Sequence, residues 1–599
     1  MLRSNLGHFA RETRAHKGLI PLIFLIGVRF ALGLAYSATV PIWEASDEDS
    51  HFAYARYLVT RGALLKPGDP EANTIQEKFQ PPLYYLALAP ALAPFDLGAA
   101  FKPPERNPYL FQGAGGFNYA IHPGELTGNG QSVARAVSLA RALSTLFSSA
   151  SLLPLYLAAR RLWPAERGLA WAAACVYGFW PQFLFVGSMV TNDGLVTALA
   201  AVVLWASVQL ALDGLRLRTV MAAGLALGAA LLTKLNAFGL VPLVVAAMLI
   251  GLTRRTGRRP RWWLLALLVS TLAVVLAWMS SQIFITTQLL RLQTVTDFLL
   301  HARPGPGGFA PSFVLSGISF SLKTFVASFG WGNLEANAAV YWIWGVGANL
   351  ALMGLVAAWV DRTRATPLMA LLLAALPVGG VAALALGLDI AQQAHLPGRY
   401  LLPGLPGVAL GAVAGWRALM PSAWRRRVWQ VVCLSVILAG WAIPFMTLAP
   451  AYAQPEPLAG HKPFDDPLSM IFGGTVELIG YQKPQPALAG EALQLTLCWQ
   501  AIRSMQENYP VQLELVGADG QQIARLETWP GHGNYPTSLW QVAAPFCDVY
   551  QIPVRGYRSL PQPVSIRVAV LDGVGGNKLP VETLGGQPAG QDVIIPWTP

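Results

Sequence analysis

A cluster of ionisable residues directly follows the first long apolar segment of the chain. Its members are Asp47, Glu48, Asp49, His51 and Arg56. Charged groups beside hydrocarbon are costly unless they face water, a partner or a substrate. If the stretch is helical, Asp47 and His51 lie on one face, because they are four residues apart. A carboxylate placed in this way can take a proton from a hydroxyl group.

A purely structural interpretation fits the same stretch. Acidic loops before helices are common, and Asp47 or Ser46 could serve as the N-cap of the helix that follows. Spacing alone does not separate the two interpretations, so both remain open here. If a divalent metal ion takes part, Asp47 and Glu48 are its expected ligands, because such ions favour carboxylate oxygens.

Two further polar groups lie at the ends of apolar segments. Asp193 follows Asn192 at the start of one segment, where it could be an N-cap or a second site carboxylate. Arg399, with His395 nearby, lies at the end of another segment. An arginine fork suits a phosphate, although a structural pair with Asp389 or with an acidic residue of the first loop fits equally well.

Other basic residues have simpler explanations. Lys234 ends an apolar run, and anchoring at the membrane interface accounts for it. Arg56, Arg135 and Arg141 could face the site, but snorkelling at helix ends explains each of them. We keep Arg56 among the candidate substrate-binding residues.

The amino-acid composition indicates the kind of protein that holds these polar side chains in place. The chain has 599 residues, of which 54% are hydrophobic and 12% charged. Soluble domains are about 25% charged, so a polytopic membrane protein is expected. The net charge of +11 does not indicate a nucleic-acid partner, because the arginines of 254–261 and 425–427 lie between apolar runs. This pattern sets membrane orientation.

About eleven transmembrane helices are expected from apolar runs of sufficient length. The runs are 18–41, 134–159, 168–187, 194–212, 217–234, 236–253, 262–285, 337–360, 366–388, 401–419 and 428–448. If residues 1–17 are cytoplasmic, every short basic connection is cytoplasmic too. The expected topology is therefore N-in and C-out in the plasma membrane, with residues 1–450 as the membrane domain.

The first outer loop, about 42–133, contains a second candidate element. Gln80-Pro-Pro-Leu-Tyr84-Tyr85 opens an apolar stretch to about residue 93 that Pro90 interrupts. The stretch is too short for a regular span, so we expect a helix on the membrane surface, with a short span as the alternative. A second surface helix is expected at about 313–327.

Beyond residue 450 the composition changes. Residues 451–475 are polar and proline-rich, like a linker, and 476–599 alternate in short runs that predict an extracytoplasmic all-β sandwich. The expected strands are 476–481, 493–499, 511–516 and 564–570. Cys498 and Cys547 could form a disulfide if the domain is exported.

Three aromatic residues of this domain, Trp529, Tyr535 and Trp540, resemble the exposed rings of carbohydrate-binding modules. Binding of a glycan or an acceptor is one hypothesis for them. Core packing and turn chemistry explain them at least as well, so the role of the domain stays open.

Several short motifs together resemble the GT-C glycosyltransferase superfamily, and are most similar to bacterial relatives of dolichyl-phosphate-mannose–protein mannosyltransferases. The motifs are the acidic pair with His51, Tyr54 to Gly62, Gln80 to Tyr85, Arg141-Ala-Leu-Ser144, Asn192-Asp193, Leu232-Thr-Lys234 and Gly398-Arg399-Tyr400-Leu-Leu-Pro403. Their order and position carry the resemblance, which covers most of residues 20–405. In the stretch from Pro41 to Asp47, no proline stands directly beside the acidic pair, as one does in closer relatives.

The resemblance implies a specific activity. Such enzymes take a sugar from a polyprenyl-phosphate donor and transfer it, usually with inversion, to a protein, lipid or glycan on the extracytoplasmic face. Asp47 would be the general base, with Glu48 beside it, and Asp193 the second acidic residue. The substrate-binding candidates are His51, Arg56, Gln80, Tyr84, His395, Arg399 and Tyr400. Family members differ in their need for a divalent metal.

Two other functions compete with this one. A transporter or flippase of polyprenyl-linked glycans would place its polar groups near the bilayer midplane, often between internal repeats. Here the ionisable residues gather at one membrane face, which favours an enzyme. A polymerase or ligase of surface polysaccharide would share the outer-face chemistry but transfer a whole glycan.

Overall fold

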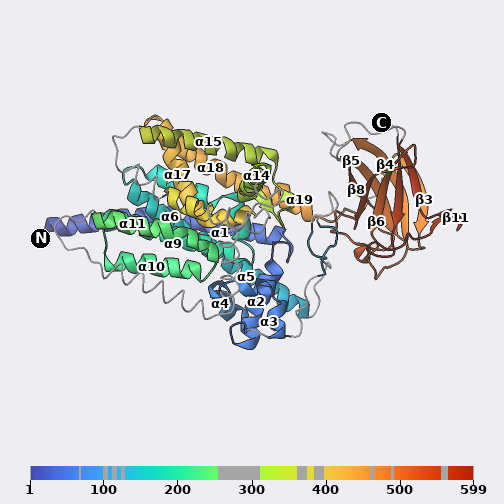
Figure 1. Cartoon of the computed structure of the whole chain (residues 1–599), viewed down its shortest axis with the longest axis horizontal. Helices are drawn as coiled ribbons and strands as arrows, with labels where there is room; N and C mark the ends of the chain where they lie inside the picture. Colours follow the sequence, from blue (N-terminus) through green and yellow to red (C-terminus); the bar gives the residue numbers. More distant parts are fainter. Residues whose placement is uncertain are drawn as a thin grey trace. The chain divides into compact units, whose positions relative to one another are not determined.

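The computed structural model describes residues 2–66, 69–98, 105–110, 118–122, 129–253, 311–360, 374–382, 397–458, 464–486, 492–554 and 564–597. The chain forms two compact units (Figure 1). Unit 1 comprises Met1–Phe101 and Gly128–Leu448, and unit 2 comprises Lys102–Thr127 and Ala449–Pro599. Unit 1 is built on helices and unit 2 on strands.

Helices form almost all of unit 1. They are α1 (Leu2–Thr39), α2 (Glu48–Arg61), α3 (Pro70–Thr74), α4 (Leu83–Leu92), α5 (Asn129–Ala150), α6 (Leu152–Leu162), α7 (Arg167–Gly178), α8 (Pro181–Val186), α9 (Asn192–Asp213), α10 (Leu217–Leu231), α11 (Val241–Thr253), α14 (Pro311–Ala327), α15 (Ala338–Val360), α17 (Leu405–Leu419) and α18 (Arg425–Ile443). Shorter pieces are the 3₁₀ helices η1 (Gln76–Phe79), η2 (Leu235–Leu240) and η3 (Gly398–Gly404) and the π-helix η4 (Pro444–Leu448).

Six helical stretches in the described ranges are long and apolar enough to cross a membrane. They are Ile20–Thr39, Gln131–Leu162, Asn192–Asp213, Leu235–Thr253, Ala338–Ala358 and Arg425–Tyr452. Large apolar side chains stand exposed on them, among them Trp342 and Met353 of α15. Such faces suit hydrocarbon rather than water. The chain is thus a multi-pass helical membrane protein, and the full set of about eleven spans stays a prediction.

The structure differs from the expected spans in three places. Residues 168–187 form two helices, α7 and α8, because the chain bends at Phe179–Trp180 and Pro181 starts a new helix. α10 is a shorter apolar helix than a full span. The run 401–419 begins inside the 3₁₀ turn η3. The run 262–285 and most of 366–388 lie outside the described residues.

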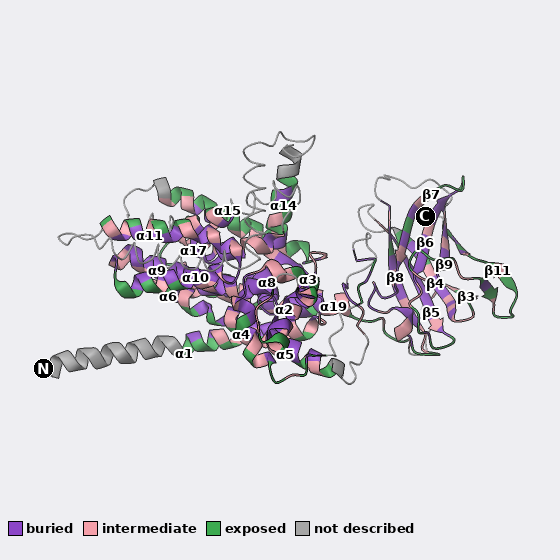
Figure 2. Cartoon of the chain, turned by 60° about the horizontal axis from the view of Figure 1, so that its bottom comes forward, coloured by how far each residue is buried: buried purple, intermediate pink, exposed green. Residues whose placement is uncertain are grey.

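Helix α9 is the most buried of the six candidate spans, and it packs against α6, α10 and α11. Elsewhere close packing depends on small residues, as is usual between membrane helices. A Cβ on Gly354 of α15 would lie 1.9 Å from the carbonyl oxygen of Gly415 in α17. Figure 2 shows buried residues concentrated on α8 and α2.

Unit 2 is an antiparallel β-sandwich, as the alternating pattern predicted. One sheet has the order β11-β10-β3-β4-β5-β8 and the other β12-β9-β6-β7. The strands are β3 (Asp466–Phe472), β4 (Val476–Pro486), β5 (Ala492–Ala501), β6 (Val511–Gly517), β7 (Gln522–Thr528), β8 (Phe546–Pro553), β9 (Val564–Val570), β10 (Val581–Thr583), β11 (Pro588–Gly590) and β12 (Val593–Trp597). A disulfide joins Cys498 of β5 to Cys547 of β8.

The boundaries of unit 2 differ from the expected ones. β3 lies within the residues 451–475 that were expected to be a linker. The segment Lys102–Thr127, which lies between α4 and α5 in the sequence, also belongs to this unit. In it, the Tyr109 hydroxyl donates to Glu527 at 2.9 Å, and the Asn118 amide donates to the Gly533 carbonyl at 2.8 Å.

The aromatic residues of unit 2 do not form an exposed platform. Trp529 and Trp540 are 2% and 5% exposed, and Tyr535 is half-buried. Trp540 belongs to the hydrophobic core between the sheets, and Tyr535 packs against it. Trp529 meets the ring of Tyr109 edge to face. Core packing therefore explains these rings, and the expectation that they are exposed was wrong.

Candidate active site

Glu48 connects four parts of unit 1. Its carboxylate accepts two hydrogen bonds from the Arg141 guanidinium, at 2.6 and 2.8 Å. It also accepts from the backbone N–H groups of Trp43 and Val190, each at 2.9 Å. Arg141 donates in turn to the carbonyls of Ser37, Val40 and Pro41 at the end of α1. Both side chains are almost fully buried, so this pair fixes the turn that precedes α2.

Asp47 occupies the N-cap position of α2, but its side chain makes no capping bond. Its backbone is left-handed, with φ of 61°, which is uncommon for a residue with a side chain. The carboxylate instead forms an ion pair with Arg399, at 2.5 Å. The structure thus contains the structural alternative for Arg399, an ion pair with an acidic residue of the first loop.

The surroundings of Asp47 change its acidity. Burial alone would raise the pKa of Asp47, but Arg399 and His51 more than offset this, so the pKa lies below its usual value. Arg399 carries the complementary effect, because Asp47 and Asp193 raise its pKa despite burial. The Nε atom of Arg399 has no hydrogen-bond partner among the described residues.

A second carboxylate–cation pair lies close by. Asp193 forms a 2.7 Å ion pair with Lys234, and both side chains are buried. The N-cap of α9 is Thr191, whose hydroxyl accepts from the Asp193 N–H, so the N-cap interpretation of Asp193 was wrong. The second oxygen of Asp193 has no hydrogen-bond partner among the residues described.

The ring of Tyr400 joins the two pairs. Lys234 Nζ lies 4.9 Å from its centroid and Arg399 Cζ lies 5.8 Å from it, so both cations contact the same ring. The Tyr400 carbonyl accepts a hydrogen bond from the Asn236 amide at 3.0 Å. Tyr400 therefore links the turn η3 to the start of η2.

The first-loop candidates surround these pairs. His51 is 2% exposed and its Nδ1 lies 2.7 Å from the Tyr85 hydroxyl. Burial lowers the pKa of His51, against the opposing effect of Glu77 and Asp47, which favours the neutral imidazole. Gln80 accepts a hydrogen bond from Asn192 at 3.1 Å. These contacts bring α2 and the start of α4 to the first turn of α9.

Two of the predicted residues make bracing contacts. The Tyr84 hydroxyl lies 2.8 Å from the Ser144 hydroxyl, which fastens α4 to α5. Arg56 uses all three guanidinium nitrogens, on the carbonyls of Leu97 and Gly98 and on Glu71. Arg56 therefore holds the fold of the first loop. His395 lies outside the described residues.

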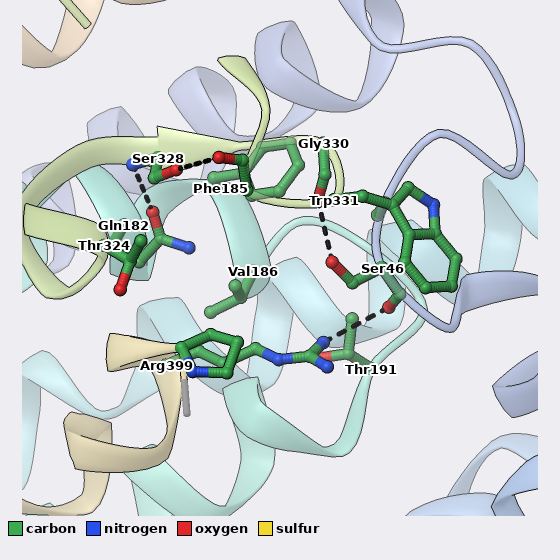
Figure 3. Close-up of a pocket in the computed structure, with 13 residues that line it drawn as sticks. Ser46, Gln182, Phe185, Val186, Thr191, Thr324, Ser328, Gly330, Trp331 and Arg399 are labelled. Carbon is green, nitrogen blue, oxygen red and sulfur yellow. Dashed lines mark hydrogen bonds between the residues drawn. The ribbon is translucent and has the colours of Figure 1, made fainter. Parts of the chain in front are cut away.

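A pocket adjoins the Asp47–Arg399 pair (Figure 3). It is lined by Ala45, Ser46, Gln182, Phe185, Val186, Thr191, Thr324, Ser328, Gly330, Trp331, Gly332, Pro397 and Arg399. The Arg399 guanidinium reaches across one side of it toward Ser46, and Gln182 accepts from the Ser328 N–H at 2.8 Å on the other. The pocket thus brings α8, α14 and the turn before α2 together beside the ion pair.

Sequence reasoning missed two residues of this arrangement. Lys234 was explained as an interfacial anchor and Arg141 as a snorkelling side chain, yet both are buried and paired with carboxylates. The signal was available for Lys234, because the Leu232-Thr-Lys234 motif had been matched to the family. Arg141 also lay in a matched motif, Arg141-Ala-Leu-Ser144, but the motif does not reveal its partner Glu48, which lies 93 residues away.

The expected metal ligands do not form a suitable set. Both Glu48 oxygens are occupied by Arg141 and two backbone N–H groups, and Asp47 is paired with Arg399. Within the described ranges, no three His, Cys, Asp or Glu side chains gather as a metal ion would require. Glu48 therefore does not fit the role of a ligand in this arrangement.

Comparison with known proteins adds to this picture. A family model described as dolichyl-phosphate-mannose-protein mannosyltransferase matches residues 126–278. The matched segment contains Arg141, Asp193 and Lys234. No curated protein gives a significant match. The match supports the predicted resemblance for residues 126–278, which are similar to this family of membrane mannosyltransferases.

Several solved structures are similar to this chain. One is ArnT from Cupriavidus metallidurans in the apo state, with 16% identity, a TM-score of 0.38, and coverage of 71% of this chain and 64% of that chain. The same protein bound to undecaprenyl phosphate has 15% identity, a TM-score of 0.37 and coverage of 73% and 74%. The Archaeoglobus fulgidus oligosaccharyltransferase in the apo form has 11% identity, a TM-score of 0.39 and coverage of 72% and 56%. The chain spans less than two thirds of the first and third of these chains.

Proposed function

We propose that this protein transfers a sugar from a polyprenyl-phosphate-linked donor to an acceptor hydroxyl, with Asp47 as the general base. The observation that carries the proposal is the pair of carboxylate–cation contacts, Asp47 with Arg399 and Asp193 with Lys234, joined by the Tyr400 ring. The matched family is named for a dolichyl-phosphate donor, which supports the donor class.

The carboxylates and the cations of this cluster have different tasks in the proposed reaction. The acceptor oxygen attacks the anomeric carbon, and the bond from that carbon to the phosphate oxygen breaks. The electron pair leaves with the polyprenyl phosphate, and the acceptor proton passes to the Asp47 carboxylate. Arg399 and Lys234 offset the negative charge that develops on the leaving phosphate. The donor already has a good leaving group, so positioning and charge stabilisation are the main requirements.

The ion pair between Asp47 and Arg399 affects the basicity of Asp47. In it, Arg399 keeps the pKa of Asp47 low, which makes the carboxylate a weak base. A donor phosphate would attract Arg399 and loosen its contact with Asp47. Because burial alone raises the pKa of Asp47, the carboxylate would then become a stronger base. Asp47 would thus become an effective base only after the donor phosphate has bound.

Asp193 is proposed to orient the transferred sugar. Its second oxygen is buried and has no hydrogen-bond partner among the described residues, so it can accept from a sugar hydroxyl. Lys234 holds its other oxygen in place. Glu48 is proposed as a positioning residue rather than a second base, since its oxygens are already occupied.

We further propose that the site and unit 2 lie on the extracytoplasmic side of the plasma membrane. The disulfide of unit 2 supports export, because disulfides persist in oxidising compartments. The basic connections at Arg160–Arg161 and Arg425–Arg427 support a cytoplasmic location for the opposite ends of the helices. A protein, lipid or envelope glycan could supply the acceptor hydroxyl.

The test is transfer of label from a panel of polyprenyl-phosphate sugars, with purified protein in lipid and native membrane extract as acceptor. We expect Asp47→Asn to lower the rate about 10²- to 10⁴-fold, the usual contribution of a general base. Asp96→Asn, which removes a similar charge from the same loop, should leave the rate unchanged. A parallel series with chelator tests the need for a metal ion.

Two results would contradict the proposal. One is full activity of a folded Asp47→Asn protein, which would remove Asp47 from the chemistry. The other is no transfer from any donor by folded wild-type protein. That outcome would favour a transporter of polyprenyl-linked glycans, or a ligase that moves a whole glycan.

A further inference from the structure

A groove lies in unit 1 between α1, α7 and α18, separate from the cluster around Asp47. Its volume is about 630 Å³. Its apolar wall includes Phe24, Trp171, Leu434 and Ile437. Phe24 and Leu434 are 73% and 59% exposed, so the groove opens at the outer surface of the helices. A groove of this kind between membrane helices is accessible to the hydrocarbon chains of lipids.

Two arginines line the same groove. Arg167 is the first residue of α7, and Arg426 lies in the first turn of α18. Both are exposed, and neither has a carboxylate partner among the described residues. The nearby acid, Glu166, is already taken by Arg417 at 2.6 Å and Arg425 at 3.4 Å. The groove therefore carries positive charge that no described acidic side chain offsets.

The apolar wall and the charged end match one class of molecule. A phospholipid with an anionic headgroup places its phosphate at the membrane surface and its acyl chains beside the helices. Basic pockets between membrane helices are known sites for such headgroups. On the proposed topology, Arg167 and Arg426 lie at the cytoplasmic surface, where anionic lipids attract basic groups.

We propose that this groove binds an anionic phospholipid of the bilayer, with its phosphate between Arg167 and Arg426. A cysteine that lines the groove can report whether the groove is occupied. Cys433 lines it and is partly accessible, whereas Cys175 beside it is buried. The other two cysteines are joined in the disulfide of unit 2. Cys433 is therefore the most accessible thiol of the chain.

The test uses the full-length protein in nanodiscs of either phosphatidylglycerol or phosphatidylcholine. Native mass spectrometry measures the lipid retained after extraction, and the rate of Cys433 alkylation measures occupancy of the groove. We expect phosphatidylglycerol to be retained and to slow alkylation. Arg167→Gln/Arg426→Gln should lower its retention about tenfold or more. The matched pair Arg218→Gln/Arg427→Gln, which changes two exposed arginines outside the groove, should behave like wild type.

A second variant tests the groove without changing its charge, so that a loss of lipid cannot be attributed to misfolding caused by the lost arginines. Cys433→Phe fills the groove without removing an arginine, and it should also lower phosphatidylglycerol retention. Equal retention of the two lipids by wild type would overturn the proposal. So would unchanged retention in Arg167→Gln/Arg426→Gln, or alkylation of Cys433 at one rate in both lipids. None of these measurements depends on glycosyl transfer.

Discussion

Asp47 and Glu48 are adjacent carboxylates in opposite situations. Glu48 is fully buried, and four hydrogen bonds from Arg141, Trp43 and Val190 surround it. Asp47 is 12% exposed, borders a pocket through its partner Arg399, and has a left-handed backbone. Glu48 holds the turn through four hydrogen bonds, whereas Asp47 is held by the single cation Arg399. On the proposed mechanism, these neighbouring acids of one sequence motif divide structural support and chemistry between them.

The largest effect on stability is expected at Glu48. Glu48→Gln leaves the buried Arg141 without its charge partner, which costs about 3–5 kcal/mol of unfolding free energy. Thermal unfolding in detergent with a folding-sensitive dye measures the loss. The double variant Glu48→Gln/Arg141→Gln should recover part of it, because the uncompensated charge is gone. Stability of Glu48→Gln within about 1 kcal/mol of wild type would make the pair unimportant for folding.

A large effect on transfer, with a smaller one on stability, is expected at Arg399. Arg399→Gln removes a cation from the leaving phosphate, and the loss of one such donor typically lowers the rate about 10²- to 10³-fold. Initial rates at saturating donor measure this. Arg417→Gln, which breaks an ion pair at Glu166, serves as the control and should keep its rate. Equal rates for wild type and Arg399→Gln would separate Arg399 from the chemistry.

The same variant should shift the pH profile. In wild type the pKa of Asp47 is below its usual value, so the basic form persists as the pH falls. Without Arg399, burial dominates and the pKa of Asp47 rises, so the acidic limb of kcat/KM moves to higher pH. The Asp47–Arg399 pair stabilises the folded protein at pH values above the pKa of Asp47 in the unfolded chain, which is about 4. This contribution is lost as the pH falls through the lowered pKa of Asp47 in the folded protein. An unmoved acidic limb would assign it to another group.

The smallest effect is expected at the pair of Lys323 and Glu335. These side chains are 44% and 51% exposed, so water screens their 2.5 Å contact. Lys323→Gln should change unfolding by no more than about 1 kcal/mol. The same unfolding assay, run beside Glu48→Gln, calibrates what a buried pair adds beyond an exposed one. A loss as large as that of Glu48→Gln would show that burial does not separate them.

The parts of the site that sequence could predict are those with local motifs. Asp47, Asp193 and Arg399 were named from short patterns, and the structure pairs each with a charged partner. Arg141 was missed because a basic residue at a helix end looks the same whether it snorkels or is buried. Burial depends on contacts made 93 residues away along the chain, which no local pattern records.

The fold shows the same limit. Alternation predicted β4, β5, β6 and β9, whose residues alternate in burial or are mostly buried. β3 was assigned to a linker because residues 451–475 are proline-rich and polar. In the structure most of its residues are only half-buried, which fits its weak hydrophobic pattern. The break between α7 and α8 lies within one apolar run, where hydrophobicity alone cannot mark it. Pro181 was the local signal.

Unit 2 takes its residues from two separate stretches of chain, and this affects how it can be removed or exchanged. A protease that cuts once after Leu448 would not release the β-sandwich cleanly, because residues 102–127 remain part of it through Tyr109 and Asn118. The nicked halves should co-purify until they are denatured. Grafting this sandwich onto another membrane half would likewise require both stretches to move together.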